Sequence, residues 1–330
     1  MKFSHCVEFA RGMAKLGFFL TAFCSSLFLI LTVFFVKDKM GSYRYFLMML
    51  PVIGFIFAFC EFMTDPFFHS YNSGFAFFRL SSFENFSPFI NLCALGCYVA
   101  FYGSTISVLT LQFVYRYWIV FRPRFIRVFF DGKRFISAIF VVSLSWFCWF
   151  SNALIFHQLD DYSSEYLGKD ILDKYGLILS EKPEFVIVAY DENGDVRLKN
   201  FLGLMVMSSL LVIRHFFGGS QYGIMIYCAI VMSIKMQEKL SVLSEKLQKV
   251  HRQFYHVLIL QITTPTLTLF FPVFALFFVP YLNIEISFPT GTILSTFALY
   301  PALDLLIMVY IASYYNQALK GTHYSLHTIH

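Results

Sequence analysis

The sequence predicts an all-α membrane protein, a bundle of seven transmembrane helices. Seven apolar stretches are each long enough to cross a bilayer, which needs about 20 residues. The composition agrees, because 58% of the residues are hydrophobic and only 14% are charged. We treat residues 1–330 as one domain with a long loop at 157–200. The predicted spans are 12–36, 45–63, 88–121, 135–156, 201–234, 257–282 and 288–315.

The charges predict the orientation of this bundle. The first, third and fifth connections and the tail hold fifteen Lys and Arg residues against four acidic ones. The N-terminus and the other connections hold nine basic residues against fifteen acidic ones, and ten of those acids lie in the 157–200 loop. Lys and Arg near span ends are retained in the cytoplasm. The N-terminus is therefore expected outside and the C-terminus inside, although Lys2, Arg11 and Lys15 oppose this locally.

The cysteines and the one glycosylation sequon give weaker signals. None of the seven cysteines lies in the 157–200 loop, so no disulfide can tie that loop to the third span. A Cys6–Cys93 bridge stays open as an alternative. The Cys and His residues lack metal-site spacing, and we expect no metal and no cofactor. Asn85-Phe86-Ser87 makes Asn85 a candidate glycosylation site very close to the membrane.

The third span carries the clearest local pattern. Its polar residues recur at steps that place them on one helical face, and a polar face in lipid must find partners on other helices. This helix is therefore expected at the centre of the bundle. Asn91 and Thr105 fit interhelical hydrogen bonding, whereas Tyr98 and Tyr102 lie where a ligand could arrive. The stripe consists of Asn91, Tyr98, Tyr102, Thr105, Gln112 and Arg116.

The stripe ends in a run from Gln112 to Pro123, QFVYRYWIVFRP. This run resembles the end of the third span in the nematode Str family of seven-transmembrane chemoreceptors, the serpentine receptors that include the diacetyl odorant receptor. Leu260-Gln261 followed by Pro265 and Pro272 resembles the sixth span of that family, and Tyr300 to Asp304 resembles the seventh. The order and spacing of these landmarks cover nearly the whole chain.

The resemblance implies a GPCR-like fold and an odorant-type receptor in the plasma membrane, in the cilium of a chemosensory neuron. Its implied partners are a small-molecule cue, a heterotrimeric G protein and membrane lipids. Arg116, flanked by Tyr115 and Tyr117, stands where such receptors contact the G protein. Because the inner part of the sixth span holds no acid, the familiar lock on this arginine must be absent or replaced.

Two further residues are candidates for the receptor switch. Asp304 could pair with Arg116, donate a hydrogen bond as an acid, or bind an ion, and an interhelical structural role is favoured. Pro265 could mark the pivot of the sixth span or only a static kink. The double glycine at Gly218-Gly219, close to Arg214, also invites a kink in the fifth span.

Helical facing alone predicts a ligand pocket in the outer half of the bundle. A pocket of these side chains suits small volatile or weakly polar molecules. The predicted lining is Tyr98, Tyr102, Met205, Ser208, Phe270, Phe274 and Phe297.

Other functions remain as alternatives. A family member that no longer signals is suggested by Leu305, where the family usually has proline, and by the uncharged stretch Ile311–Leu319. A ligand-gated channel of the insect odorant-receptor type has its N-terminus inside, which the charge distribution opposes. No HExxH or Ser/His arrangement suggests an enzyme, and we expect no nucleic-acid partner.

Overall fold

The computed structural model describes residues 2–36, 43–80, 86–130, 132–179, 184–211, 221–240, 259–261, 263–284 and 290–311. Within these residues, six helices are long and apolar enough to cross a membrane. The fifth predicted span consists of two shorter apolar helices. Residues 212–220, which include Arg214 and the double glycine, separate those helices and lie outside the described part, as does Asn85.

The first five spans contain α1 (Lys2–Leu31), α2 (Tyr43–Thr64), α3 (Pro88–Phe121), α5 (Ile136–Phe156), and the pair α7 (Leu198–Leu211) and α8 (Gln221–Leu240). The sixth contains a π-helical segment (Thr266–Phe270) and α10 (Phe271–Tyr281). The seventh contains α11 (Gly291–Leu294), a 3-10 turn (Ser295–Leu299) and α12 (Tyr300–Ile311). A π-helical turn (Thr32–Val36) follows α1, and α4 (Pro123–Phe129) and a 3-10 turn (Gly132–Phe135) join α3 to α5.

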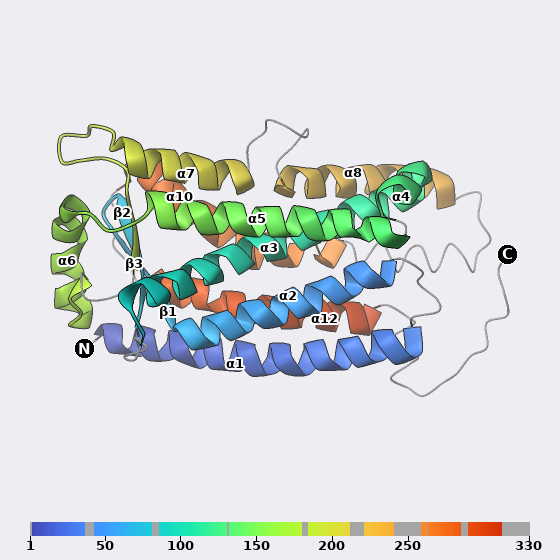
Figure 1. The fold of residues 1–330 in the computed structure, drawn as a ribbon, viewed down its shortest axis with the longest axis horizontal. Helices are drawn as coiled ribbons and strands as arrows, with labels where there is room; N and C mark the ends of the chain where they lie inside the picture. The colour runs from blue at the N-terminus through green and yellow to red at the C-terminus, as the bar shows by residue number, and fades with distance from the viewer. Residues whose placement is uncertain are drawn as a thin grey trace.

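The long helix α3 runs through the middle of the bundle, as the sequence predicted (Figure 1). It packs against α2, α5 and α8, whereas α1 lies at one side against α2 and the seventh span. Its most apolar stretch is 72% buried, compared with 28% for α5. The polar stripe of α3 is therefore shielded from lipid.

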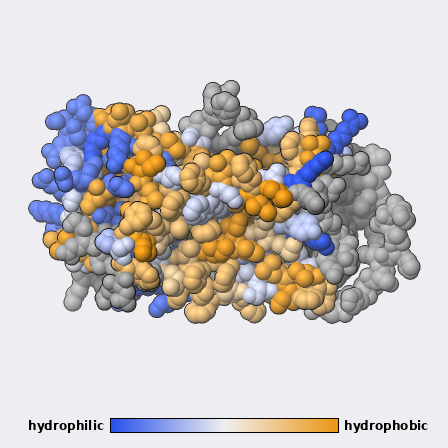
Figure 2. Space-filling model, in the orientation of Figure 1, coloured by the Kyte–Doolittle hydropathy of each residue, from blue (hydrophilic) through white to orange (hydrophobic). Residues whose placement is uncertain are grey.

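The two ends of the bundle differ in polarity from its middle. Figure 2 shows an apolar belt over the helices, with hydrophilic residues gathered at the end where α1 begins and a smaller group near α4. An apolar belt between polar ends is the surface that a bilayer requires. We name the first end the cap end, because a small sheet and α6 (Asp161–Tyr175) cover it.

The cap contains a sheet that the helical prediction missed. β1 (Pro66–Tyr71) pairs antiparallel with β2 (Gly74–Arg79), and β2 pairs antiparallel with β3 (Glu184–Val188). The sheet thus joins the second connection of the chain to the fourth. Successive strand residues face opposite sides. One face packs under α6, and its members are Phe67, Ala76, Phe78, Val186 and Val188 with Leu167 and Ile171 of the helix.

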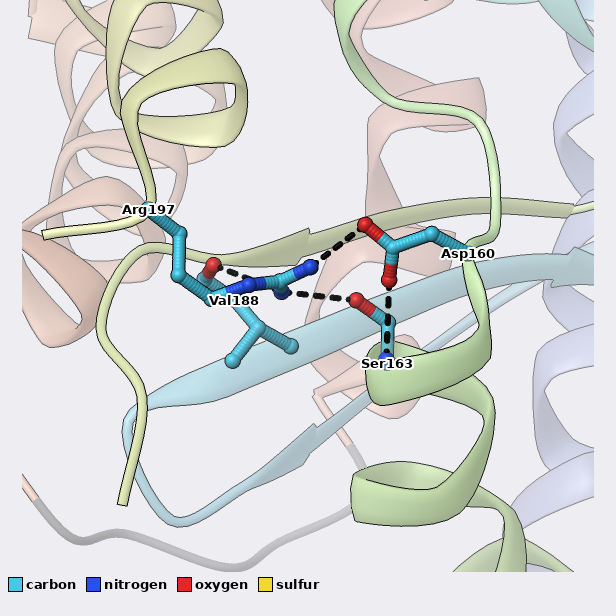
Figure 3. A network of polar contacts seen from close by, with 4 residues as sticks. All are labelled: Asp160, Ser163, Val188 and Arg197. Atoms are coloured by element: carbon cyan, nitrogen blue, oxygen red, sulfur yellow. Dashed lines mark hydrogen bonds and ion pairs between the residues drawn. The ribbon is translucent and has the colours of Figure 1, made fainter. Parts of the chain in front are cut away.

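A charged network fixes where the cap meets the bundle (Figure 3). The Asp160 carboxylate caps α6 by accepting the Ser163 backbone N–H at 2.9 Å and pairs with Arg197 just before α7. Arg197 also donates to the Ser163 hydroxyl at 2.9 Å and to the Val188 carbonyl of β3 at 3.1 Å. Burial favours the neutral acid, but the Ser163 hydrogen bonds and the Arg197 charge together lower the pKa of Asp160.

A buried arginine ties β2 to the end of α2. Arg79 donates to the Thr64 carbonyl at 2.9 Å and the Met63 carbonyl at 3.2 Å. These carbonyls belong to the last turn of α2, where a cation is favourable. Arg79 also donates to Oδ1 of Asn91 in α3 at 2.6 Å. This partner of Asn91 lies on the strand β2, whereas the stripe predicted a partner on another helix.

The close approach of α1 to the seventh span gives a first prediction. A Cβ added to Gly17 would lie 2.3 Å from the Ala298 Cβ, whereas one added to Gly12 would meet nothing within 4 Å. Both changes raise helix propensity alike, by about 1 kcal/mol, but overpacking costs about 1–3 kcal/mol. Gly17→Ala should lower the thermal unfolding midpoint of the purified protein, and Gly12→Ala should not. Equal midpoints for the two variants would show that the seventh span shifts enough at Ala298 to accommodate the added methyl group.

The buried acid Glu184 predicts that the stability of the cap depends on pH. Glu184 is 8% exposed, and burial raises the pKa of its carboxyl from 4.5 to about 8. Between these values the folded chain keeps a proton that the unfolded chain releases. Stability should therefore fall as pH rises from about 4.5 through about 8, by at most about 1.4 kcal/mol per pH unit.

Glu184→Gln should flatten this dependence, measured as the unfolding midpoint between pH 5 and pH 8. Glu165→Gln, on the exposed face of α6, provides the matched control and should leave the slope unchanged. A slope that persists in Glu184→Gln would assign the pH dependence to another group.

Candidate functional site

A cavity lies between the sheet and the bundle helices, with about 610 Å³ of space not occupied by atoms, its opening included. The sheet contributes its second face as the roof, and α3, α5, α7, α10 and the seventh span form the walls. The lining residues are Phe68, Phe75, Phe77, Tyr98, Val99, Tyr102, Trp149, Ala153, His157, Phe185, Ile187, Met207, Val273, Leu276, Phe277, Leu294 and Phe297.

Regular spacing explains why these side chains converge. Trp149, Ala153 and His157 are four residues apart and so share one face at the end of α5. In the sheet, Phe75 and Phe77 of β2 alternate with the residues that pack under α6. The surface of the cavity is apolar, and no charged side chain lines it among the described residues. The site therefore suits an uncharged, largely apolar molecule.

Three of the predicted pocket residues line this cavity: Tyr98, Tyr102 and Phe297. The ring of Tyr102 stacks on Phe297 with centroids 5.7 Å apart and meets Trp149 edge-on at 5.8 Å. Tyr98 stacks on Phe57 of α2 at 5.1 Å. These contacts between α2, α3, α5 and the seventh span hold the aromatic wall in place.

The other four predicted positions do not line the cavity. Met205 is 48% exposed and Phe274 is 40% exposed on the outside of the bundle, so their predicted inward facing was wrong. Met207 takes the place of Met205, about 200° further around α7 at 3.6 residues per turn. Phe270 is buried outside the lining, and the Ser208 hydroxyl donates to the Leu204 carbonyl of its own helix at 2.7 Å.

A buried acid stands behind the cavity wall. Glu61 of α2 is 2% exposed, and the Tyr98 hydroxyl donates to its carboxyl at 3.5 Å. Glu61 is one of the fifteen acidic residues counted above with the N-terminus and the outer connections, although it lies within the predicted span 45–63. Its position one helical turn before the end of α2 could have signalled burial.

The sixth span lines the cavity from α10, which directly follows the π-helical segment. After Pro265 the chain makes the π-helical segment, in which the Phe271 N–H donates to the Thr266 carbonyl five residues earlier. The Tyr102 hydroxyl donates to the Leu269 carbonyl in this segment at 3.3 Å. A cavity-lining side chain of α3 is thus bonded to the irregular backbone beside the predicted pivot, Pro265.

Toward the opposite end of the bundle, a polar link joins three spans. The Arg116 guanidinium of α3 donates to the Gln261 amide oxygen and contacts the Met308 sulfur of α12 at 3.8 Å. The Gln261 amide nitrogen lies 3.4 Å from both carboxyl oxygens of Asp304, which is fully buried. Gln261 therefore bridges Arg116 and Asp304. Through this bridge Asp304 contacts another span, which is the interhelical structural role expected of it.

The tyrosines beside Arg116 face different neighbours. Tyr115 is buried against Phe46 of α2, with ring centroids 4.9 Å apart, and against Phe130 at 5.8 Å. Tyr117 lies 6.0 Å from the Tyr227 ring of α8. Around Arg116, α3 is therefore packed against both sides of the bundle.

Leu305 is 1% exposed and lies in the unbroken helix α12. Without the proline usual in the family, α12 continues to Ile311. Residues 312–319 of the uncharged stretch lie outside the described part. Cys93 is a free thiol, so the Cys6–Cys93 bridge is not formed.

Helices long and apolar enough to cross a membrane, a cavity toward one end and a half-buried arginine bonded to other spans toward the opposite end are the arrangement expected of a seven-span membrane receptor. The chain matches the family described as serpentine type 7TM GPCR chemoreceptor Str over residues 10–320. It therefore belongs to the Str family, and the predicted seven-transmembrane class and nematode chemoreceptor family are confirmed. This family is one of receptors rather than enzymes.

Similar proteins come from two nematodes. The G-protein coupled receptor str-33 of Caenorhabditis elegans is 31% identical over 318 residues, covering 94% of this chain and 90% of that protein. Serpentine receptor class r-10 of C. elegans is 25% identical over 277 residues, covering 83% and 79%. Its Caenorhabditis briggsae counterpart is 24% identical over 309 residues, covering 91% and 86%.

The bridge at Gln261 gives a third prediction. Gln261→Leu removes the side chain that bonds both Arg116 and Asp304, and an unsatisfied buried polar group costs about 1–3 kcal/mol. The unfolding midpoint should therefore fall. Thr263→Val is the control on the same span, because Thr263 is exposed and its hydroxyl donates to the Ile259 carbonyl of its own helix. Adding Asp304→Leu to Gln261→Leu should restore part of the loss. Additive losses would contradict the bridge.

Proposed function

We propose that this protein is a G protein-coupled chemosensory receptor that binds a small molecule in the cavity and signals through a heterotrimeric G protein. In this proposal the cap end faces outside and the α4 end faces the cytoplasm. The excess of basic residues on the connections of the α4 end supports that orientation. The proposed location is the plasma membrane, in the cilium of a chemosensory neuron.

The observation that carries the proposal is the hydrogen bond from Tyr102 to the Leu269 carbonyl. Tyr102 touches the cavity, and Leu269 lies in the π-helical segment of the sixth span. Eight residues before Leu269, the same span presents Gln261 to Arg116. A ligand that displaces the Tyr102 hydroxyl would act on a span whose other part holds the arginine. A ligand shifts a conformational equilibrium only through such differential contacts.

The inner end provides the groups for coupling. Arg116 is held by Gln261 rather than by an acid of the sixth span. Gln261 is therefore our candidate for the residue that replaces the familiar acidic lock on this arginine. Movement of the sixth span near Pro265 would part Gln261 from Arg116 and leave the guanidinium available to a G protein. Exposed Arg122, Arg124 and Arg134 lie nearby in the chain and also suit anionic lipid headgroups.

A family member that no longer signals is the second candidate. The leucine at position 305 favours it, because α12 continues without the break that a proline would impose. Such a protein would keep the cavity and lose the response. Binding and signalling must therefore be measured separately.

The fourth prediction tests signalling in a sensory neuron that expresses the chain, by calcium imaging against volatile and water-soluble odorants. At least one odorant should evoke a response, and Arg116→Ala should abolish it while the variant still reaches the cilium. A response that survives Arg116→Ala would contradict G protein coupling through this residue. Silence despite ciliary localisation would favour the non-signalling reading.

In the same assay, Tyr102→Phe keeps the aromatic wall and removes the hydrogen bond to Leu269. We expect a shifted dose–response curve, or activity without ligand, at unchanged surface expression. Tyr310→Phe makes the same chemical change at a residue that is 80% exposed and should behave as wild type. An unchanged curve for Tyr102→Phe would remove the proposed link from the cavity to the sixth span.

A further inference from the structure

The polar atoms around the cavity belong to few side chains. Among the lining residues, the side chains that contain nitrogen or oxygen are those of Tyr98, Tyr102, Trp149 and His157. The remaining lining side chains are those of Phe, Val, Ala, Ile, Leu and Met. Where the polar atoms of these residues lie therefore decides which hydrogen bonds the cavity can offer to a bound molecule.

Both tyrosines use their hydroxyl groups outside the cavity. The Tyr98 hydroxyl donates to the carboxyl of Glu61 at 3.5 Å, and the Tyr102 hydroxyl donates to the Leu269 carbonyl at 3.3 Å. Neither Glu61 nor Leu269 is a lining residue. The tyrosines therefore present their rings to the cavity, and their hydroxyls are committed to neighbouring spans.

The nitrogens of Trp149 and His157 are also turned away. A Cβ added to Gly103 would lie 2.5 Å from Nε1 of Trp149, so this edge of the indole packs on the backbone of α3. Nε2 of His157 lies 2.9 Å from the Asn152 amide oxygen, and a Cβ added to Gly203 would lie 2.9 Å from the same nitrogen. Nδ1 of His157 is buried too. None of these nitrogens is exposed on the cavity surface, which consists of apolar atoms.

The backbone of the roof offers no polar group either. β2 is the central strand and pairs with β1 on one side and with β3 on the other. Backbone N–H and C=O groups point toward neighbouring strands, whereas side chains stand out from the faces of the sheet. The roof therefore presents the apolar side chains of Phe75, Phe77, Phe185 and Ile187. A bound water needs about two to four polar partners, so this surface does not hold one.

We propose that the ligand of this cavity is a small hydrocarbon, aliphatic or aromatic, without a hydrogen-bonding group. This inference rests on the proposed ligand-binding function and names the chemical class of the ligand. The walls would stabilise such a molecule by burial and dispersion contacts. A hydroxyl or carbonyl group would lose its hydrogen bonds to water and gain none. The cavity therefore selects against polar molecules of the same size.

The test compares pairs of similar shape in which a hydrocarbon group is replaced by a polar one: pentane with butan-1-ol, 2-methylbut-1-ene with butan-2-one, and benzene with pyridine. Binding to the purified full chain in lipid nanodiscs is measured by headspace gas chromatography, with empty nanodiscs as the blank for partitioning into lipid. Each hydrocarbon should bind about five- to 150-fold tighter than its polar counterpart, the range for burying an unpaired polar group. Equal or tighter binding of the polar compounds overturns the proposed ligand class.

A polar group added to the roof gives a matched pair of variants. Ile187 lines the cavity from β3. Threonine and valine have the same shape, but only Ile187→Thr adds a hydroxyl group. The preference for the hydrocarbon should be about two- to tenfold smaller in Ile187→Thr than in Ile187→Val, the range of one net hydrogen bond. Equal preferences in the two variants overturn binding against the roof.

A second pair of variants locates the bound hydrocarbon. Ala153→Leu fills the cavity from α5 and should abolish binding. Ile155→Phe adds bulk to the same helix at a side chain that is 58% exposed and should bind as the wild type does. Hydrocarbon binding that survives in Ala153→Leu overturns the cavity as the site. If Ala153→Leu fails to fold, the two Ile187 variants decide the same question.

The end of a lipid acyl chain has the same chemistry and is the other source of such a ligand. Repeating the measurement in amphipol, with lipid removed, distinguishes the two sources. An unchanged dissociation constant supports a free hydrocarbon ligand. Tighter binding in amphipol overturns the free ligand and assigns the site to an acyl chain that lipid supplies.

The outcomes separate this inference from the proposed function. Failure of every hydrocarbon to bind overturns the inference. A calcium response to a polar odorant that Ala153→Leu abolishes would also overturn the hydrocarbon class, but would keep the cavity as the pocket of the receptor. Signalling itself is judged independently by the Arg116→Ala comparison.

Discussion

The structure depends on one constraint: each polar group on α3 must find a partner within the membrane. In lipid an unpaired polar group is costly, and the stripe of α3 meets this demand from several directions. Gln112 donates to the Phe46 carbonyl of α2 at 3.0 Å. Ser107, a polar residue of α3 outside that stripe, donates to the Ser145 hydroxyl of α5 at 2.7 Å. Tyr102 and Arg116 bond the sixth span. These partners fix where the neighbouring spans stand around α3.

The same constraint explains how much could be predicted from the sequence. The spans follow from length and hydropathy, and the central place of α3 follows from its polar stripe. Tyr98 and Tyr102 of that stripe are buried and Arg116 is half-buried, as an inward face requires, whereas their roles in binding and coupling stay predictions. Gln261 was recognised as polar, but its role as a bridge between Arg116 and Asp304 needed the packing of three spans.

Facing predictions failed where a helix is irregular or lacks a polar stripe. The sixth span contains a π-helical segment, which has more residues per turn than an α-helix, so the facing of Phe274 beyond it could not be counted at 3.6 residues per turn. In α7 no polar stripe marked the inner face, and Met205 was chosen instead of Met207. The sheet was missed because its strands are only five or six residues long and lie in two different connections. Asn72-Ser73 between two aromatic runs, with Asn72 at φ +48°, is nevertheless a recognisable hairpin signal.

The cap shows how a chain without a cysteine in its 157–200 loop can still fix that loop to the bundle. β3 is held by the pairing with β2, by the Val186 bond to His157 and by Arg197 with Asp160. Each is non-covalent, and a typical hydrogen bond contributes about 0.5–1.5 kcal/mol. A roof held this way can open locally without the bundle unfolding, which a disulfide would resist. Because His157 supports β3 through its backbone and lines the cavity with its ring, occupancy of the cavity and closure of the roof act on the same residue. A ligand packed against that ring would stabilise the closed cap, and by linkage a closed cap would strengthen its binding.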